Sequence, residues 1–181
     1  MMTKLHALLR RVNRYVALIL GLVLIATVLF ILTDVMLRAM GRGSLGGSDE
    51  ISGYVVAAVA SWGLSFALLE RAHVRIDFIR QKLAQGGQIA MDIFALIVTN
   101  AVIVLIAVHC WPVLEKTLAR GAKANTPLET PLWIPQGIWF SGWVWFAVTA
   151  TLLTLIALSY MLTGQRAGFD AAAGIGSEVE Q

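Results

Sequence analysis

Four long stretches of the 181-residue chain contain no Asp, Glu, Lys or Arg, and this pattern constrains the fold more than any other feature. They run over residues 15–33, 51–69, 93–114 and 130–165. A helix that crosses the hydrocarbon core of a membrane needs about 20 consecutive, mostly apolar residues, so each stretch is long enough. Continuous apolar runs also exclude the alternating pattern of a membrane β-barrel. The sequence therefore predicts an all-α integral membrane fold with four transmembrane helices.

The composition agrees with a membrane protein. Hydrophobic residues make up 58% of the chain and charged residues 14%, whereas soluble domains are nearer one half and one quarter. The net charge of +3 does not indicate a nucleic-acid partner, because the cations lie in short segments beside apolar runs. The single cysteine, Cys110, can form no internal disulfide and belongs to no metal-ligand pattern.

The N-terminal segment, residues 1–14, has the pattern of a short amphipathic helix. Its apolar residues share one face at helical spacing, and its arginines lie opposite. Such a helix would lie in the membrane surface among lipid headgroups, although a basic tail that only sets orientation is the alternative. A cleaved signal peptide is disfavoured, because the apolar run that follows exceeds the usual 7–15 residues.

These patterns divide the chain into three parts. An amphipathic helix at 1–14 precedes a four-helix transmembrane domain at 15–163, and an Ala/Gly-rich tail at 164–181 is expected to be disordered. We place the four spans at about 15–36, 51–70, 90–112 and 136–162.

The distribution of Lys and Arg predicts the orientation. Nine Lys and Arg residues fall on the side of the two termini, and five fall on the other side. Of the nine, four precede the first span, four lie between the second and third spans, and one follows the fourth. Because cytoplasmic segments carry the excess of cations, both termini are expected in the cytoplasm. Aromatic residues expected at the two interfaces form a belt of Tyr15, Trp111, Trp133, Trp139 and Tyr160.

The predicted spans lack the groups that carry a charge or a cofactor across a membrane. Ionisable side chains near the middle of a membrane are costly, and the estimated span centres here have none. Asn100 is the only amide deep in a span, and His109 is the only histidine within one, so a haem held by two histidines is not expected. We therefore expect no enzyme activity, no metal, no cofactor and no substrate site in this chain.

The second predicted span carries small residues at every fourth position, on one helical face. Small side chains let helix backbones approach closely, which is a main source of helix association in lipid. This face can pack within the chain's own bundle or against a partner subunit. It consists of Gly53, Ala57, Ser61 and Ser65.

A family resemblance begins in the segment between the first and third spans. Arg38 follows the first span, Asp49 and Glu50 open the second, and Trp62-Gly63 lies within it. The second span ends in Arg71-Ala72-His73-Val74-Arg75-Ile76-Asp77, and Thr130-Pro131-Leu132-Trp133-Ile134-Pro135 leads into the fourth. Together with the length and layout, these motifs resemble the DctQ-type small membrane subunit of TRAP (tripartite ATP-independent periplasmic) transporters. Asp49 departs from the glutamate that is common there but keeps its charge.

The resemblance implies a function and partners. It implies a scaffold subunit beside a large twelve-helix permease subunit, in a sodium-coupled importer of an organic anion such as a carboxylate or sugar acid. A periplasmic binding protein would deliver that anion, and the large subunit would bind the sodium. The implied location is the bacterial inner membrane. The alternative is a stand-alone four-helix membrane anchor or small carrier outside any tripartite system.

The motif residues are candidates for partner contacts. Arg71 and Arg75 lie near the C-terminal end of a helix, where cations are favoured, and Asp77 can pair with either. His73 is expected to hydrogen-bond a neighbouring group rather than to sense pH. Glu50 lies at the N-terminus of a predicted helix, where the helix dipole favours an acid. The functional interpretation is a contact of Glu50 with Arg38 or with the arriving binding protein.

Overall fold

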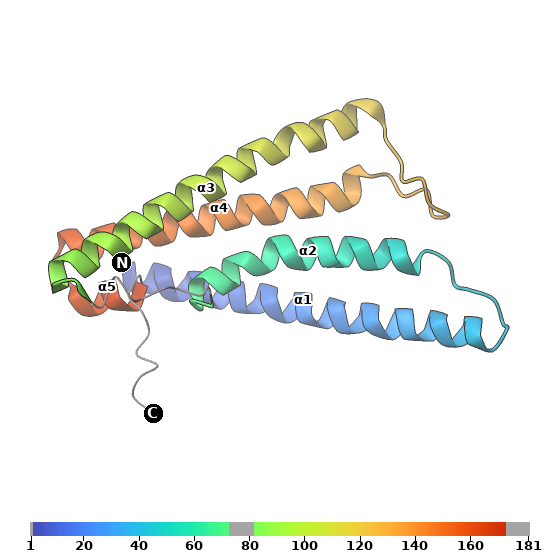
Figure 1. Ribbon diagram of the computed structural model, residues 1–181, viewed down its shortest axis with the longest axis horizontal. Helices are drawn as coiled ribbons and strands as arrows, with labels where there is room; N and C mark the ends of the chain where they lie inside the picture. The colour runs from blue at the N-terminus through green and yellow to red at the C-terminus, as the bar shows by residue number, and fades with distance from the viewer. Residues whose placement is uncertain (1, 73–81, 173–181) are drawn as a thin grey trace.

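The computed structural model describes residues 2–72 and 82–172, and long helices form throughout the predicted spans (Figure 1). Each of the four long helices is apolar enough to cross a membrane, which confirms an all-helical fold with four candidate spans. A fifth, short helix follows them. The helices are α1 (Met2–Ala39), α2 (Ser48–Leu69), α3 (Gln85–Arg120), α4 (Trp133–Leu162) and α5 (Arg166–Ala172).

The first helix is longer than predicted, and the structure does not confirm a separate interfacial helix over residues 1–14. Helix α1 runs without interruption from Met2 to Ala39. Its sequence contains no proline and a single glycine, Gly21, so nothing in it breaks the backbone hydrogen bonding. Part of the predicted apolar face is nevertheless buried, because Leu9 is only 5% exposed and belongs to the core of the protein, whereas Leu8 is 56% exposed.

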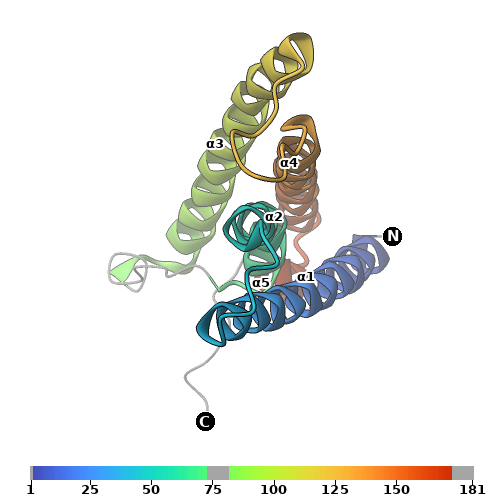
Figure 2. The ribbon, with the colours of Figure 1, turned by 90° about the vertical axis from the view of Figure 1, so that its right-hand side faces the viewer.

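The four long helices form an open row in the order α1, α2, α4, α3. Helix α2 packs against both α1 and α4, and α3 packs against α4 (Figure 2). The start of α1 and helix α5 lie at one end of the row, together with the end of α2 and the start of α3 (Figure 1). We call this the terminal end, and we call the opposite end, with the α1–α2 and α3–α4 connections, the loop end.

Helix α4 lies inside the row and supplies most of the core. Its side chains Phe146, Ala150, Leu153 and Ile156 are all at most 5% exposed. The flanking helices contribute fewer residues, and the outer surfaces of α1 and α3 stay uncovered. Leu22 of α1 and Phe94 of α3, for example, are each 68% exposed. In a membrane, such apolar surfaces face lipid or another subunit.

Helices α2 and α4 approach each other closely at Gly142. A Cβ atom added at Gly142 would lie 2.7 Å from both Ser61 Cβ and Trp62 Cδ1, which is closer than real Cβ contacts. A side chain at this position would therefore force the two helices apart. Because α2 and α4 belong to different hairpins, this contact joins the two halves of the protein.

The C-terminal segment differs from the expectation of disorder over 164–181. Residues Arg166–Ala172 form helix α5, and residues 173–181 lie outside the described range. Phe169 anchors α5 because its side chain is 3% exposed in the core. Gly168 permits the contact, since an added Cβ would lie 2.7 Å from Tyr160 Cδ1.

The contact at Gly142 predicts that Gly142→Ala lowers stability by about 1–3 kcal/mol, the usual cost of overpacking. Gly137→Ala in the same helix is the matched control, because a Cβ there meets no atom within 4 Å. Equilibrium unfolding in mixed micelles measures both. Equal stability of the two variants would contradict the close approach.

Candidate functional site

A carboxylate of α1 organises the α1–α2 connection at the loop end. Asp34 is 1% exposed, and its Oδ1 accepts hydrogen bonds from the Leu45 backbone N–H at 2.6 Å and from Ser44 Oγ at 2.8 Å. Its Oδ2 accepts a hydrogen bond from Ser48 Oγ at 2.8 Å and pairs with the guanidinium of Arg38. Arg38 also donates to Ser44 and Ser48, both at 3.1 Å. The connection is therefore folded around one buried carboxylate.

A second carboxylate links the two connections at the loop end. Glu50 is 9% exposed, and its Oε1 accepts a hydrogen bond from the Tyr54 hydroxyl at 2.6 Å. Its Oε2 accepts a hydrogen bond from Thr126 of the α3–α4 connection. Gly47 and Leu128 meet beside this pair, since a Cβ at Gly47 would lie 2.7 Å from Leu128 Cγ. The positive φ of Gly47, 71°, suits glycine as well.

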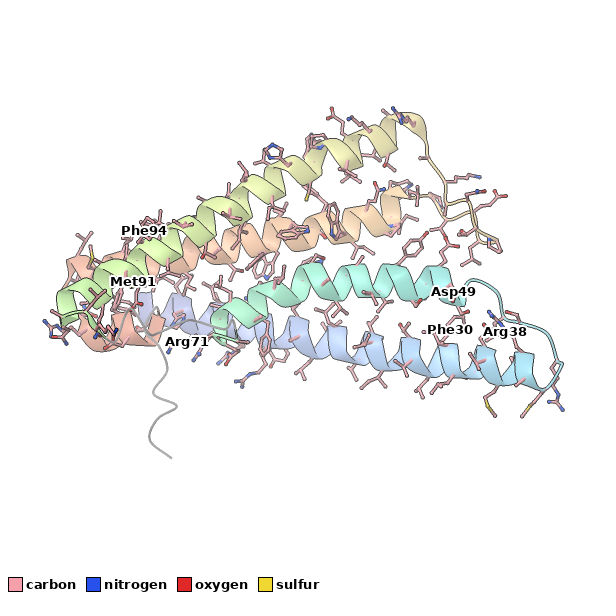
Figure 3. The ribbon with its side chains drawn as sticks, in the orientation of Figure 1. Phe30, Arg38, Asp49, Arg71, Met91 and Phe94 are labelled. Atoms are coloured by element: carbon pink, nitrogen blue, oxygen red, sulfur yellow. The ribbon has the colours of Figure 1, made fainter. Side chains whose placement is uncertain are left out.

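Of the two contacts suggested for Glu50, the one with Arg38 does not form in this arrangement. Arg38 pairs with Asp34 in its own helix, one turn away, and Glu50 is held by hydroxyl groups. Asp49, the other acid of the motif, is exposed beside Arg38 at the same end of the molecule (Figure 3). Asp49 is therefore the acid of the pair that remains accessible to a partner at the loop end.

A buried amide connects three helices nearer the terminal end. Asn13 of α1 has no exposed surface, and its Oδ1 accepts a hydrogen bond from Ser65 Oγ of α2 at 2.6 Å. The same oxygen accepts a hydrogen bond from Trp145 Nε1 of α4 at 3.1 Å. The indole of Trp145 stacks on that of Trp62, with ring centroids 6.4 Å apart. One side chain therefore ties the edge helix α1 to both of the inner helices.

Arginine side chains hold the end of α2 at the terminal end. Arg10 of α1 donates to the Leu69 carbonyl oxygen at 3.4 Å and lies 3.8 Å from the carboxylate of Glu70. Arg71 donates to the Asp170 carbonyl oxygen of α5 at 2.9 Å. Cations near a helix C-terminus are favourable because the last carbonyl groups have no partners within the helix. His73, Arg75 and Asp77 lie outside the described residues.

The small-residue face of α2 is divided in the structure. Ser61 and Ser65 are 1% and 0% exposed and face α4 and Asn13, so these positions pack within the chain. Gly53 is exposed, and no atom lies within 4 Å of a Cβ built there. Ala57 has intermediate exposure. Only the part of the face nearest the loop end is open to a partner.

The residues of the expected aromatic belt differ in their exposure. Trp111 and Trp133 are 48% and 51% exposed at the loop end, and Tyr15 is 62% exposed towards the terminal end. Trp139 is half-buried. Tyr160 differs from the expectation, because α5 covers its ring and leaves it 5% exposed. Sequence reasoning placed Tyr160 at a lipid interface because it did not include α5.

Within residues 2–72 and 82–172, no group of three or more His, Cys, Asp or Glu side chains is placed to hold a metal ion. Asn100 is bonded across the α3–α4 contact, where it accepts a hydrogen bond from Thr151 at 3.0 Å. An open cavity of about 600 Å³ between α3 and α4 is lined by apolar side chains such as Val104, Val108 and Val144.

Sequence reasoning missed three residues that hold the structure together. Asn13 was included in a surface segment, and Asp34 and Thr126 received no role. A signal was present for the first two, because a polar residue next to an otherwise apolar run is costly in lipid unless it has a partner. The sequence contains no signal that identifies Thr126 as the partner of Glu50.

One comparison with known proteins identifies a family. The family model described as "Tripartite ATP-independent periplasmic transporters, DctQ component" matches residues 27–160. The match begins within α1 and ends at Tyr160 of α4, so it covers most of the membrane-spanning part. No curated protein and no solved structure matches the chain significantly.

The Asn13 network predicts that Asn13→Ala destabilises the protein by about 1–3 kcal/mol. Two hydrogen bonds between helices are lost, and such bonds contribute about 0.6 kcal/mol on average and up to about 1.7 in a membrane protein. A double-mutant cycle with Trp145→Phe, read by unfolding in mixed micelles, isolates the bond to the indole. Ser141→Ala is the control, because the exposed Ser141 bonds only a carbonyl of its own helix. An Asn13→Ala protein as stable as this control would contradict the network.

Proposed function

Because the chain belongs to the DctQ component family of the tripartite ATP-independent periplasmic transporters, we propose that it braces a large permease subunit and leaves the transport step to that subunit. The chain is a small membrane subunit of a transporter, and its family is not one of enzymes.

The open row of helices is the observation that carries the scaffold role. A closed bundle would cover its own inner faces, whereas this row leaves the outer surfaces of α1 and α3 uncovered. Two residues show the scale of this exposure, Ile25 of α1 at 59% and Leu105 of α3 at 60%. Helices in lipid associate through such surfaces by close packing. The row therefore offers broad faces to a second membrane subunit.

The two buried carboxylates at the loop end, Asp34 and Glu50, support the same division of labour. A charged solute that crosses a membrane needs polar groups that are free to bind it at mid-depth. Here Asp34 is saturated by the α1–α2 connection, and Glu50 is held by Tyr54 and Thr126. Both lie at the loop end. These acids hold connections in place and are not arranged along a path between helices.

The family relationship also supports a proposal for the whole transporter. We propose a sodium-coupled importer of an organic anion, such as a carboxylate or a sugar acid, in which a periplasmic binding protein delivers the anion. The large subunit would bind both sodium and substrate. The exposed Asp49, at the loop end, is a candidate contact for the arriving binding protein.

The distribution of cations supports a proposal for the location and orientation of the chain. We propose the bacterial inner membrane with both termini in the cytoplasm, because nine of the 14 Lys and Arg residues fall on the side of the termini when counted along the sequence. Under this orientation the carboxylates of the loop end face the periplasm. The binding protein would arrive on that side.

The scaffold role predicts that the chain reconstituted alone in liposomes inserts but moves neither sodium nor an organic anion. When it is co-expressed with its large subunit, affinity purification in mild detergent should recover both. The controls are empty liposomes and a detergent extract without the tagged chain. Substrate or sodium flux through the chain alone would support the stand-alone carrier instead.

The orientation predicts where reporter fusions are active. Alkaline phosphatase, which is active only in the periplasm, should be active when fused after Arg42 or after Lys123. A fusion after Gln165 should be inactive, and a cytoplasmic reporter there should be active. Activity with the opposite pattern would reverse the proposed orientation.

A further inference from the structure

A cavity at the terminal end has no role in the contacts described above. Its volume is about 460 Å³, within the usual range of ligand sites, and it lies between the first turn of α3 and the last turn of α4. Helix α5 closes one side through Arg166, Phe169 and Asp170. The cavity is therefore bounded by three helices and depends on the folded position of α5.

The position of the cavity along the helices matches the headgroup layer of a membrane. Gln88, in its wall, precedes the charge-free stretch that starts at Ile93. At a rise of about 1.5 Å per residue, this offset is roughly 7–8 Å. The headgroup region extends roughly 5–8 Å beyond the hydrocarbon core on each side. Gln88 thus lies at the depth where phospholipid headgroups reside.

The polar side of the cavity carries one cation and one anion. Arg166 Nη1 donates a hydrogen bond to Gln85 Oε1 at 2.8 Å, which holds the guanidinium at the cavity wall. Asp170 lies one turn further along α5, and its backbone carbonyl is fixed by Arg71. Among the described residues, the Asp170 carboxylate has no hydrogen-bond or ion-pair partner, and Arg166 has none besides Gln85. Both side chains are exposed to what enters the cavity.

The other side of the cavity is apolar. Ile89 of α3 and Met161 of α4 line it, and the buried ring of Phe169 lies against it. Met161 is 42% exposed on the outer surface of the row. A ligand that fits must therefore combine two opposite charges with an apolar portion that continues towards the hydrocarbon core.

From this arrangement we propose that the cavity binds the headgroup of a zwitterionic, phosphoethanolamine-type phospholipid. The phosphate contacts Arg166 and the free amide N–H groups of Gln85, and the ammonium contacts the Asp170 carboxylate. The acyl chains lie against Ile89 and Met161. The carboxylate gives the selectivity, because it attracts the ammonium and repels a headgroup with net negative charge.

The bound lipid would hold α5 against the membrane-spanning row. The helix has only seven residues and is too short to be stable alone, so it depends on its contacts with α3 and α4. A ligand that binds only the folded arrangement stabilises it by mass action. This effect supplies a readout that does not depend on transport.

The test uses the full chain, delipidated in detergent and titrated with dioleoyl phosphatidylethanolamine or dioleoyl phosphatidylglycerol. Native mass spectrometry counts bound lipids, and the thermal midpoint reports stabilisation. We expect one site that prefers phosphatidylethanolamine about fivefold, the effect of one partly exposed ion pair. Free phosphoethanolamine and inorganic phosphate, as competitors, should displace the lipid only at far higher concentrations, since they lack the acyl chains.

Three variants assign the site to its residues. Asp170→Asn should remove the preference between the two lipids, and Arg166→Gln should weaken the binding of both. Arg11→Gln removes a cation from the same end of the molecule but outside the cavity, so it should bind as the unmodified chain does.

Several outcomes would overturn the proposal. Equal or tighter binding of phosphatidylglycerol to the unmodified chain would show that Asp170 does not select the headgroup. If Asp170→Asn kept the preference for phosphatidylethanolamine over phosphatidylglycerol, Asp170 would likewise not be the selecting residue. This outcome can be read without the Arg166 variant. Competition by free phosphoethanolamine at the concentration of the lipid would identify a water-soluble ligand instead.

Discussion

The close packing of α2 on α4 joins the two halves of this protein, and the remaining contacts depend on it. Lipid tails are as apolar as leucine, so helices in a membrane gain little from hydrophobic burial and associate through packing and hydrogen bonds. At Gly142 the backbone of α4 comes close enough to touch Ser61 and Trp62. The stacking of Trp62 on Trp145 and the hydrogen bonds of Asn13 then form around this contact. Without the α2–α4 contact, the α1–α2 and α3–α4 hairpins would lose the main packing between them.

Polar side chains in this chain serve mainly to fix the ends and the order of the helices. Asp34 shapes the α1–α2 connection, and Glu50 attaches the α3–α4 connection to it. Asn13 performs a similar task between helices, where a carbonyl oxygen with two donors has no competition from water. Buried polar groups of this kind favour one arrangement over others, which fits the proposed scaffold role.

The open row of helices fits the proposed role beside a larger membrane subunit. A row has two faces and two edges, and its outer helices remain available to lipid or to another subunit. At the terminal end, α5 folds back over Tyr160 and creates a cavity at headgroup depth. The proposed lipid site and the proposed scaffold role are independent, since the cavity lies at the membrane surface and the scaffold faces lie along the spans.

The sequence alone determined that this is a four-span helical membrane protein, because uncharged runs of that length satisfy their backbone only as helices in lipid. Its motifs also identified the family, which the family match to residues 27–160 confirms. The tertiary structure decided which polar residues matter. The partners of Asn13, Ser65 and Trp145, are 52 and 132 residues away in the chain, and Thr126 is 76 residues from Glu50. Hydropathy shows which segments are apolar enough to lie within the hydrocarbon core. It contains no information about which helix packs beside which. That order, and with it the continuous α1, the buried Tyr160 and the inward-facing Ser61, arises only when the helices pack.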